Sequence, residues 1–300
     1  PVTILAGTAV GGGLDRVARA LAAALDETRL LDVPVEVVNI PGDGARLVWG
    51  EVFRRPGDPH LLSVSSPNLT TDRLLGVADF GHAETTPIAV LVSDAIAFCV
   101  AAASPLKTGA DLLAALARAP GELDIVLATA LGNPNHMALA DAARHAGHDA
   151  GALRVRAFDS APDAVAAVVN GAADLGAVSA ASVIRALDEG TLRVLGITAP
   201  ERMPGPLAAV PSWVEQGLPC TIGAWRGVSG PSGMPAEAVA FWSEAVAAAS
   251  RTDAWRDALL RQSWAPMLLT GDELARHLNE EDAMMRAGLS ELGLLPEAAA

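Results

Sequence analysis

Short apolar runs and helix-spaced hydrophobic positions alternate along the chain. Residues 2–5 form a β-prone run, residues 7–13 interrupt it with glycines, and apolar positions then recur at helical spacing from Asp15 onward. Residues 35–39 form a second β-prone run, which ends in a Pro-Gly turn. A strand, helix and strand in this order favour a parallel sheet with right-handed crossovers.

The same alternation continues to the end of the chain. It predicts further strands at 61–64, 88–92, 95–100, 124–128, 154–158, 175–178 and 192–197, the last of which completes a second parallel sheet. It predicts helices from 109 to about 119, 136–145 and 161–170, and three helical stretches between 235 and 294. Residues 220–228 are expected to be extended.

These elements predict two α/β lobes. If the last three helices return to the first lobe, lobe one comprises 1–100 plus 225–300 and lobe two comprises 101–224. The chain then crosses between the lobes near 98–104 and 219–227. Two adjacent crossover strands make a hinge, which is what a clamshell receptor needs.

Composition narrows the class of protein. The chain has 300 residues, of which 51% are hydrophobic, and this exceeds what one core usually organises. No apolar run reaches the roughly 18 residues that span a bilayer. The net charge of -14 repels phosphate backbones, so nucleic acid is not an expected partner. The chain starts inside a predicted strand, and we expect either a cytosolic protein or one whose leader has been removed.

The glycine run Gly11, Gly12 and Gly13 is the first candidate site. It follows a strand and opens a helix, where free amide groups and the helix dipole favour an anion. The glycines are consecutive and Arg16 follows, so the run does not match the dinucleotide fingerprint, and no cofactor is expected. The alternative is a flexible turn without a ligand.

A second turn occupies the equivalent place in the predicted lobe two. Gly132, Asn133 and His136 lie between a strand and the start of a helix. Two anion-friendly helix ends, one in each lobe, suggest one ligand between them. The alternatives are that Asn133 only caps its helix and that His136 only caps or packs.

Two serines are weaker candidates. Ser160 precedes a helix and could donate to a carboxylate or cap that helix, and Ser179 ends a strand among small residues. The nucleophile-elbow, phosphate-loop and zinc-protease motifs are absent from the sequence, and we find no paired acid and base. His145 and His148 lack further metal ligands apart from Asp149, so neither an enzyme nor a metal site is expected.

Taken together, these segments resemble the receptors of tripartite tricarboxylate transporters, also called Bug receptors. The family's P-G-G-G-x-D-x-x-A-R corresponds to residues 10–19, and its E-N-x-P-G-A-G-G to residues 38–45. Shorter matches follow in order at 86–89, 104–112, 132–136, 171–175, 210–217, 225–227 and 231–235. Each piece alone is weak, but their order and spacing over nearly the whole chain are specific.

The resemblance implies a periplasmic binding protein-like (type II) clamshell of two Rossmann-like lobes. It implies an extracytoplasmic solute-binding receptor, periplasmic or secreted and either free or lipid-anchored, that delivers a small organic carboxylate to membrane permease subunits. We expect a monomer. The pocket residues carried over are Gly12, Gly13 and Asp15 from lobe one and Gly132, Asn133 and His136 from lobe two, with Gly11, Leu14, Ser160 and Ser179 as further candidates.

Departures from the family pattern shape the ligand prediction. Val10 stands where proline is usual, Leu14 where threonine is frequent, and Ala130 and Leu131 replace a serine-rich approach. The stretch that replaces the serine-rich approach begins with Thr129, and we take all three departures as replacements by apolar bulk. They predict a ligand with a hydrophobic or aromatic body and one carboxylate. Arg16 is the only basic residue in the proposed loops, which fits binding by backbone amides.

The two cysteines lack the close spacing of a zinc or redox motif, so they are either buried thiols or one long-range disulfide. Cys99 and Cys220 fall at the two predicted crossings, and the oxidising compartment implied by the resemblance permits a bond. We therefore predict a hinge disulfide.

Two other functions remain open at this point. A sensory receptor could bind the same ligand and present its closed form to a signalling partner. An enzyme of similar architecture would need a paired nucleophile and base in the cleft.

Overall fold

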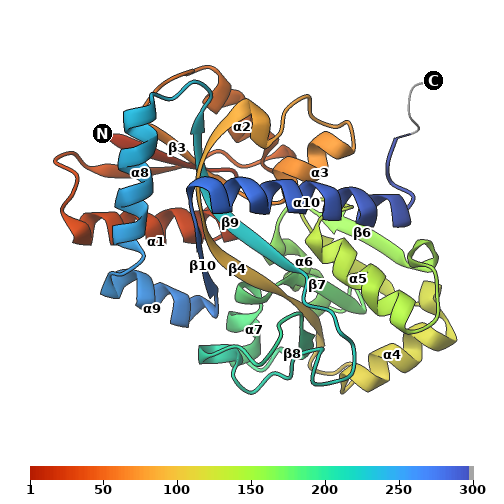
Figure 1. Ribbon diagram of the computed structural model, residues 1–300. Coiled ribbons are helices and arrows are strands. Elements are labelled where there is room, and N and C mark those ends of the chain that lie inside the picture. The colour runs from red at the N-terminus through yellow and green to blue at the C-terminus, as the bar shows by residue number, and fades with distance from the viewer. Residues whose placement is uncertain (297–300) are drawn as a thin grey trace.

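The computed structural model describes residues 1–296, which fold around a ten-stranded mixed sheet (Figure 1). The strands are β1 (Val2–Ala6), β2 (Val35–Asn39), β3 (Leu61–Ser65), β4 (Thr85–Ala101), β5 (Asp124–Ala128), β6 (Arg154–Phe158), β7 (Leu175–Ser179), β8 (Leu192–Ile197), β9 (Gly223–Pro231) and β10 (Ala265–Leu269). The α-helices are α1 (Gly13–Thr28), α2 (Arg46–Phe53), α3 (Asn68–Leu74), α4 (Gly109–Arg118), α5 (Pro134–His145), α6 (Ala161–Val169), α7 (Ile184–Asp188), α8 (Ala236–Ala249), α9 (Asp253–Gln262) and α10 (Gly271–Glu291).

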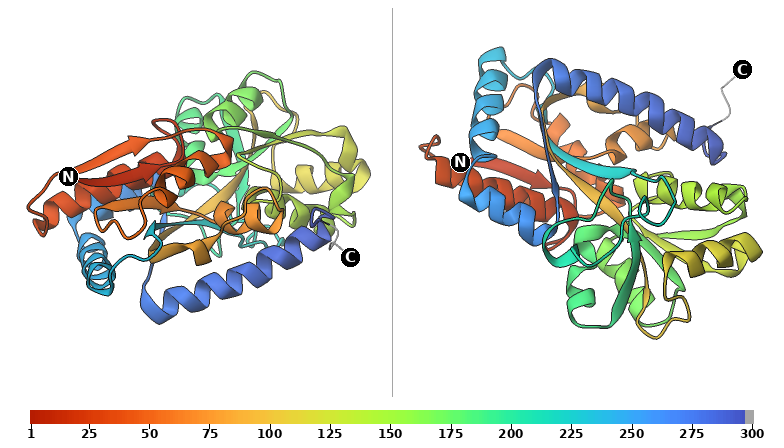
Figure 2. Two further views of the ribbon diagram at one scale, coloured as in Figure 1. Left: turned by 90° about the horizontal axis from the view of Figure 1, so that it is seen from above. Right: turned by 60° about the horizontal axis from the view of Figure 1, so that its bottom comes forward.

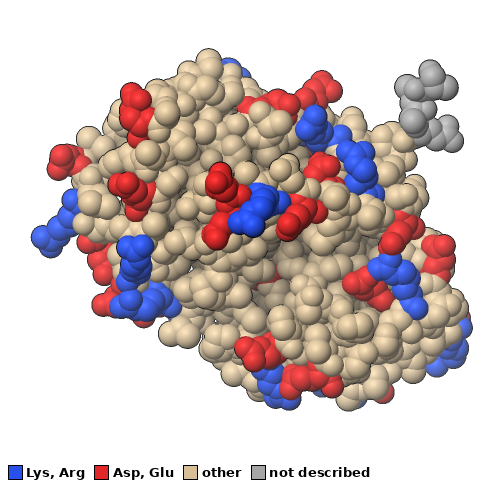
Figure 3. Space-filling view, in the orientation of Figure 1, with Lys and Arg blue, Asp and Glu red and all other residues tan. Residues whose placement is uncertain are grey.

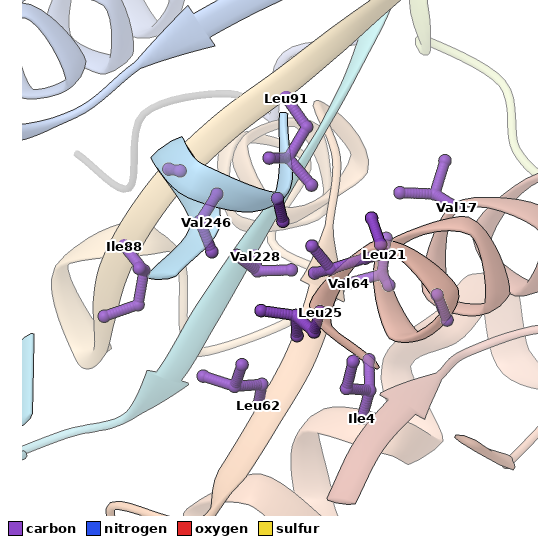
Figure 4. Close-up of a cluster of buried hydrophobic side chains, with 14 of the residues drawn as sticks. Ile4, Val17, Leu21, Leu25, Leu62, Val64, Ile88, Leu91, Val228 and Val246 are labelled. Atoms are coloured by element: carbon purple, nitrogen blue, oxygen red, sulfur yellow. The ribbon is translucent and has the colours of Figure 1, made fainter. Parts of the chain in front are cut away.

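The first half of the sheet holds β2, β1, β3 and β9 beside the start of β4. Strands β1, β2 and β3 run parallel, whereas β9 is antiparallel to β3 and β4. Helix α1 covers one face because its buried stripe, with Val17, Leu21 and Leu25 in it, packs against strand residues such as Ile4 and Val64 (Figure 4). Helices α8 and α9 pack beside α1 on this core.

The second half of the sheet holds β6, β5 and β7, which are parallel, and the end of β4. Buried side chains cover both of its faces. The prediction that β8 completes a parallel sheet was wrong, because β8 pairs antiparallel with β4. Figure 2 shows this half, in green and yellow, beside the first.

Strand β4 is the main connection between the halves. Its residues as far as Ala95 pair with β9, and from Ile96 onward they pair with β7. The pairing partner of β4 therefore changes at 95–96, and β9 begins at Gly223, while the predicted crossings near 98–104 and 219–227 stay predictions. We call residues 1–95 and 223–296 lobe one and residues 96–222 lobe two.

Helix α10 reaches from one lobe to the other. Leu274, near its start, packs against Val90 of β4 and Trp225 of β9. Its last turns bring Met285 and Leu289 against Met137 of α5 in lobe two. The final helix of the chain, shown in blue in Figures 1 and 2, therefore belongs to the core of lobe one and also contacts lobe two.

The predicted hinge disulfide is not formed. Cys99 and Cys220 are both free, buried thiols. Cys99 packs in the cluster on one face of the lobe-two sheet with Val126 and Val178, whereas Cys220 packs in the other cluster with Phe98. Because neighbouring side chains of a strand point to opposite faces, the sheet itself lies between the two sulfurs. Burial raises the pKa of the Cys99 thiol to about 12.

Candidate functional site

A cavity of about 320 Å³ lies between the two lobes. Its lining comes from the loops that follow the carboxyl ends of the parallel strands β1, β2 and β3 in lobe one and β5, β6 and β7 in lobe two. The carboxyl ends of parallel strands meet at one edge of a sheet, which is the usual place for ligands in α/β proteins. The volume lies at the lower end of the range for small-molecule sites.

The start of α1 forms the lobe-one wall of the cavity, where Gly12, Gly13 and Leu14 line it. Gly12 is the N-cap and offers no side-chain cap. None of the hydrogen bonds among the described residues uses the N–H of Gly13 or Leu14. A side chain at Gly12 would collide with Thr8, because its Cβ would stand 2.1 Å from the Thr8 hydroxyl. The glycine run therefore leaves an uncapped helix start open to the cavity.

Asp15 does not line the cavity, and its carboxylate holds the glycine run in place through hydrogen bonds. Its carboxylate accepts hydrogen bonds from the Gly11 amide at 2.8 Å, from Arg19 at 2.9 Å and from Asn39 at 2.9 Å. Burial alone would raise the pKa of Asp15, but these three donors hold it below its ordinary value. Asp15 is thus an anchor for the loop, and its oxygens are occupied. Gly11 also lies outside the cavity, beside Arg16.

The lobe-two helix start is already capped by its own side chain. Asn133 lines the cavity, and its side-chain oxygen accepts from the His136 amide at 3.2 Å. Its amide nitrogen donates to the Ala128 carbonyl and to the Thr129 hydroxyl. Asn133 thus contributes a polar wall, while its helix start has less capacity for an anion than that of α1.

Gly132 and His136 point away from the cavity. The His136 Nδ1 accepts from the Gly132 amide at 3.0 Å, and a side chain at Gly132 would meet Leu289 of α10. Burial lowers the pKa of His136 to about 4, so the ring is neutral at physiological pH. These two predicted site residues stabilise the turn and the contact with α10.

Ser160 and Ser179 both line the cavity. Ser160 caps α6 by accepting from the Asp163 amide, and its hydroxyl donates to the Asp163 carboxylate. Ser179 shares a hydrogen bond of 3.0 Å with Ser182, which also lines the cavity. No histidine, cysteine or lysine is among the described lining residues.

Two side-chain contacts cross the cleft and were not foreseen from the sequence. Asn68 at the start of α3 donates to the Thr129 hydroxyl at 3.1 Å, and Arg16 donates to the Ser182 hydroxyl at 3.0 Å. Each bond joins lobe one to lobe two. Their partners stand more than 60 positions apart in sequence, and only the folded sheet brings them together.

Arg226 is the functional candidate that the sequence reasoning missed. It lies on β9, lines the cavity, and is close to the start of α1. The available signal was an arginine inside the otherwise apolar and glycine-rich strand Gly223–Pro231. Asp94, 1% exposed, lies on the neighbouring strand β4. Burial raises the pKa of Asp94, while attraction to Arg226 and Arg16 lowers it.

Charged side chains are dispersed over one face of the protein. On the face shown in Figure 3, basic side chains stand singly or in small groups beside acidic ones, and no broad basic patch covers it. Among the described residues, no group of three histidine, cysteine or carboxylate side chains could hold a metal ion, and no helix has both the length and the apolar character needed to span a membrane.

This cleft between two α/β lobes, joined by two strands and lined by helix starts and small polar side chains, defines a solute-binding protein. The sequence model described as Tripartite tricarboxylate transporter family receptor, TctC, matches residues 17–294. The chain therefore belongs to this family of receptors, which are periplasmic and serve a tripartite transporter.

Solved structures agree with this assignment. A TctC solute-binding protein from Polaromonas is 26% identical, with a TM-score of 0.70, over 97% of this chain and 98% of that one. MatC from Rhodopseudomonas palustris with bound malate is 25% identical, with a TM-score of 0.79, over 96% and 98%. An R. palustris protein with adipate is 23% identical, with a TM-score of 0.86, over 99% and 98%. No curated protein sequence matches the chain.

Proposed function

We propose that the chain captures a small organic carboxylate between its lobes and holds the carboxylate at the start of α1. The observation that carries this proposal is the uncapped first turn of α1, where the amides of Gly13 and Leu14 face the cavity without an acceptor. Backbone amides at a helix start form a ready anion site because the helix dipole favours negative charge there. The malate and adipate bound to two similar proteins support the same chemistry.

The predicted hydrophobic or aromatic body of the ligand depends on one side chain. Leu14 lines the cavity, whereas Val10 is 72% exposed and lies outside it, as does Leu131. The remaining lining consists of glycine, alanine, proline and polar side chains, with the carboxylates of Asp43, Asp159 and Asp163 among them. We therefore propose that the ligand is a carboxylate with an apolar segment that contacts Leu14. An aromatic ring in the ligand stays a prediction.

The closed receptor would then deliver its ligand to the permease subunits of a tripartite transporter. We propose that it does so as a monomer in the periplasm, without catalysis. The two bonds that cross the cleft, Asn68 to Thr129 and Arg16 to Ser182, support a closed form in which both lobes contribute to ligand enclosure.

The test removes one amide without disturbing the helix. Proline is tolerated at the first position of a helix, and the extended backbone of Gly12 (φ -72°, ψ 168°) suits a following proline. Gly13→Pro therefore deletes one proposed donor, and Gly13→Ala is the matched control, since an added Cβ meets nothing closer than 3.9 Å.

We expect the native chain to bind at least one of malate, adipate and benzoate in isothermal titration calorimetry. The Gly13→Pro variant loses a hydrogen bond to a charged group, so it should bind the acid about 10-fold to 100-fold more weakly than Gly13→Ala does. Absence of binding to every acid of a broad carboxylate panel would overturn the proposed function. Equal affinities of the two variants would show that the ligand carboxylate does not bind at the start of α1.

A further inference from the structure

The guanidinium of Arg226 is incompletely satisfied at the wall of the cavity. Its Nη1 donates to the Trp225 carbonyl at 2.9 Å. Its Nε is buried and has no hydrogen-bond partner among the described residues. A buried donor without an acceptor is costly, and a charged one more so. One edge of this guanidinium therefore lacks the acceptor that a folded protein normally provides.

Arg226 shares its neighbouring carboxylate with a second arginine, and the cavity lining also holds Asp43, Asp159 and Asp163. Arg16 and Arg226 flank a single buried carboxylate, Asp94. Asp94 attracts both arginines without a hydrogen bond to either, and it accepts from the Ser179 side chain and from the Ala181 amide at 3.4 Å. Burial lowers the pKa of Arg226, attraction to Asp94 raises it, and Arg16 lowers it further. Because Asp94 also attracts Arg16, an anion in the cavity would give Arg226 a counter-charge of its own.

Arg16 is less available than Arg226 for that anion. Its two terminal nitrogens donate to the Gly11 carbonyl at 2.8 Å and to the Ser182 hydroxyl at 3.0 Å. It therefore ties the glycine run to lobe two. Arg16 does not line the cavity that Arg226 lines.

The free edge of Arg226 faces the start of α1. The position that a Cβ of Gly13 would occupy is 3.9 Å from the Arg226 Nη2 and 4.0 Å from its Nε. The same region contains the open amides of Gly13 and Leu14. A planar carboxylate placed there can accept two parallel bonds from the Nε and Nη2 edge of an arginine and further bonds from amides.

We propose that Arg226 is a specificity-determining residue that binds the ligand carboxylate together with the α1 amides. The site then selects ionised acids over uncharged amides or esters of the same shape, because an uncharged group would leave the buried guanidinium without its counter-charge. This inference rests on the proposed function and refines it, since it adds a side-chain cation to a site predicted to rely on backbone amides.

A purely structural role for Arg226 explains less of the geometry. Its one bond to Trp225 is to a backbone carbonyl of the adjacent residue, and its attraction to Asp94 involves no hydrogen bond. Neither contact uses the Nε edge. A structural role also predicts that removing Arg226 affects charged and uncharged ligands equally.

The test compares Arg226→Gln and Arg226→Lys with the control Arg193→Gln. Arg193 is a half-buried arginine of β8 that donates to the carbonyls of Ala102 and Leu106 and does not line the cavity. Each protein is titrated calorimetrically with malate, adipate and benzoate and with their amides malamide, adipamide and benzamide. Thermal unfolding of each variant identifies any general loss of structure, and the lysine variant retains the charge if glutamine prevents folding.

We expect Arg226→Gln to weaken binding of the acid by about 30-fold or more, as when a buried charge loses its partner, and to change binding of the amide less than about 3-fold. The affinity of Arg226→Lys for the acid should lie between those of the native chain and of Arg226→Gln, because lysine keeps the charge but lacks the planar guanidinium of arginine. Arg193→Gln should match the native chain. Unchanged acid affinity in Arg226→Gln, or equal losses for acid and amide, would overturn the inference while leaving the proposed function intact. Absence of acid binding in the native chain would overturn both.

Discussion

Thr129 has a left-handed backbone conformation that β-branched residues rarely adopt. Its φ is +72°, it lines the cavity, and its hydroxyl accepts from both Asn68 and Asn133. Strain of this kind costs about 1–3 kcal/mol and is found where the surrounding structure fixes the residue, often at functional sites. The hydroxyl contacts are what hold the side chain at this point.

Two substitutions separate the backbone strain of Thr129 from its hydroxyl contacts. Thr129→Ala and Thr129→Gly both remove the hydroxyl, but glycine alone relieves the positive φ. We expect Thr129→Gly to be the more stable variant by about 1 kcal/mol, measured by chemical denaturation. If Thr129→Ala were equally stable or more so, the backbone at this turn would not be strained.

Asp15 makes the glycine run sensitive to acid. Its lowered pKa means that it contributes stability at pH values above its unfolded value, and this contribution is lost as the pH falls through its folded value. We expect Asp15→Asn to destabilise the protein by about 2–3 kcal/mol near pH 7, because charge-assisted bonds from Gly11 and Arg19 are lost. Denaturation at several pH values should show the difference shrinking below about pH 4. A constant difference would show that the Asp15 charge is not involved.

At the residue scale, local signals predicted part of the site. Consecutive glycines before a helix identified the open start of α1, and an asparagine in the same context identified Asn133. The sequence places the Asp15 carboxylate near the loop but does not show that Arg19 and Asn39 bind it, and a ligand contact of Asp15 stays a prediction. Arg226 was missed because its position beside Gly13 depends on the pairing of β9 with β3 and β4, which no local pattern encodes.

Helix α10 carries a buried carboxyl group beneath the returning strand β9. Glu281 is 3% exposed, and its side chain accepts from the Trp225 indole. Burial raises the pKa of Glu281 to about 8, against a smaller lowering by that bond. A carboxyl whose folded pKa is raised destabilises the folded state as the pH rises from its unfolded value near 4.5 to about 8.

Glu281→Gln should therefore stabilise the protein at neutral and alkaline pH. The amide keeps an acceptor for Trp225 and has no charge to bury. We expect a gain of about 1–3 kcal/mol at pH 8 that disappears near pH 4.5, measured by urea denaturation across this range. A difference that is independent of pH would contradict a protonated Glu281 in the folded chain.

At the element scale, helices were predicted more accurately than strand pairing. The helices α1, α4, α5 and α6 begin within a few residues of their predicted starts because apolar spacing and capping residues are local signals. Strand β4 was predicted as two strands, since the polar Ser93 and Asp94 resemble a break, yet Asp94 is buried beside two arginines. The orientation of β8 depends on a long-range register that periodicity does not contain.

At the scale of the whole molecule, an acidic chain can still contain a binding site for an anion. The chain has a net charge of -14, whereas the wall of the cavity combines the start of α1 with Arg226, and Arg16 lies outside the cavity near Asp94. Short-range dipoles and buried charges outweigh distant surface charges that salt screens. The two-lobed architecture and its crossing strands were predictable from the order of elements, but the contacts across the cleft were not.

The most direct test of this account is a crystal structure of the chain with the tightest-binding acid of the carboxylate panel. We expect one ligand in the cavity between the lobes, with its carboxylate within hydrogen-bonding distance of the Gly13 and Leu14 amides and of the Arg226 Nε and Nη2. A carboxylate bound at the Asn133 side with the α1 amides and Arg226 left free, or a ligand outside the cavity, would contradict it.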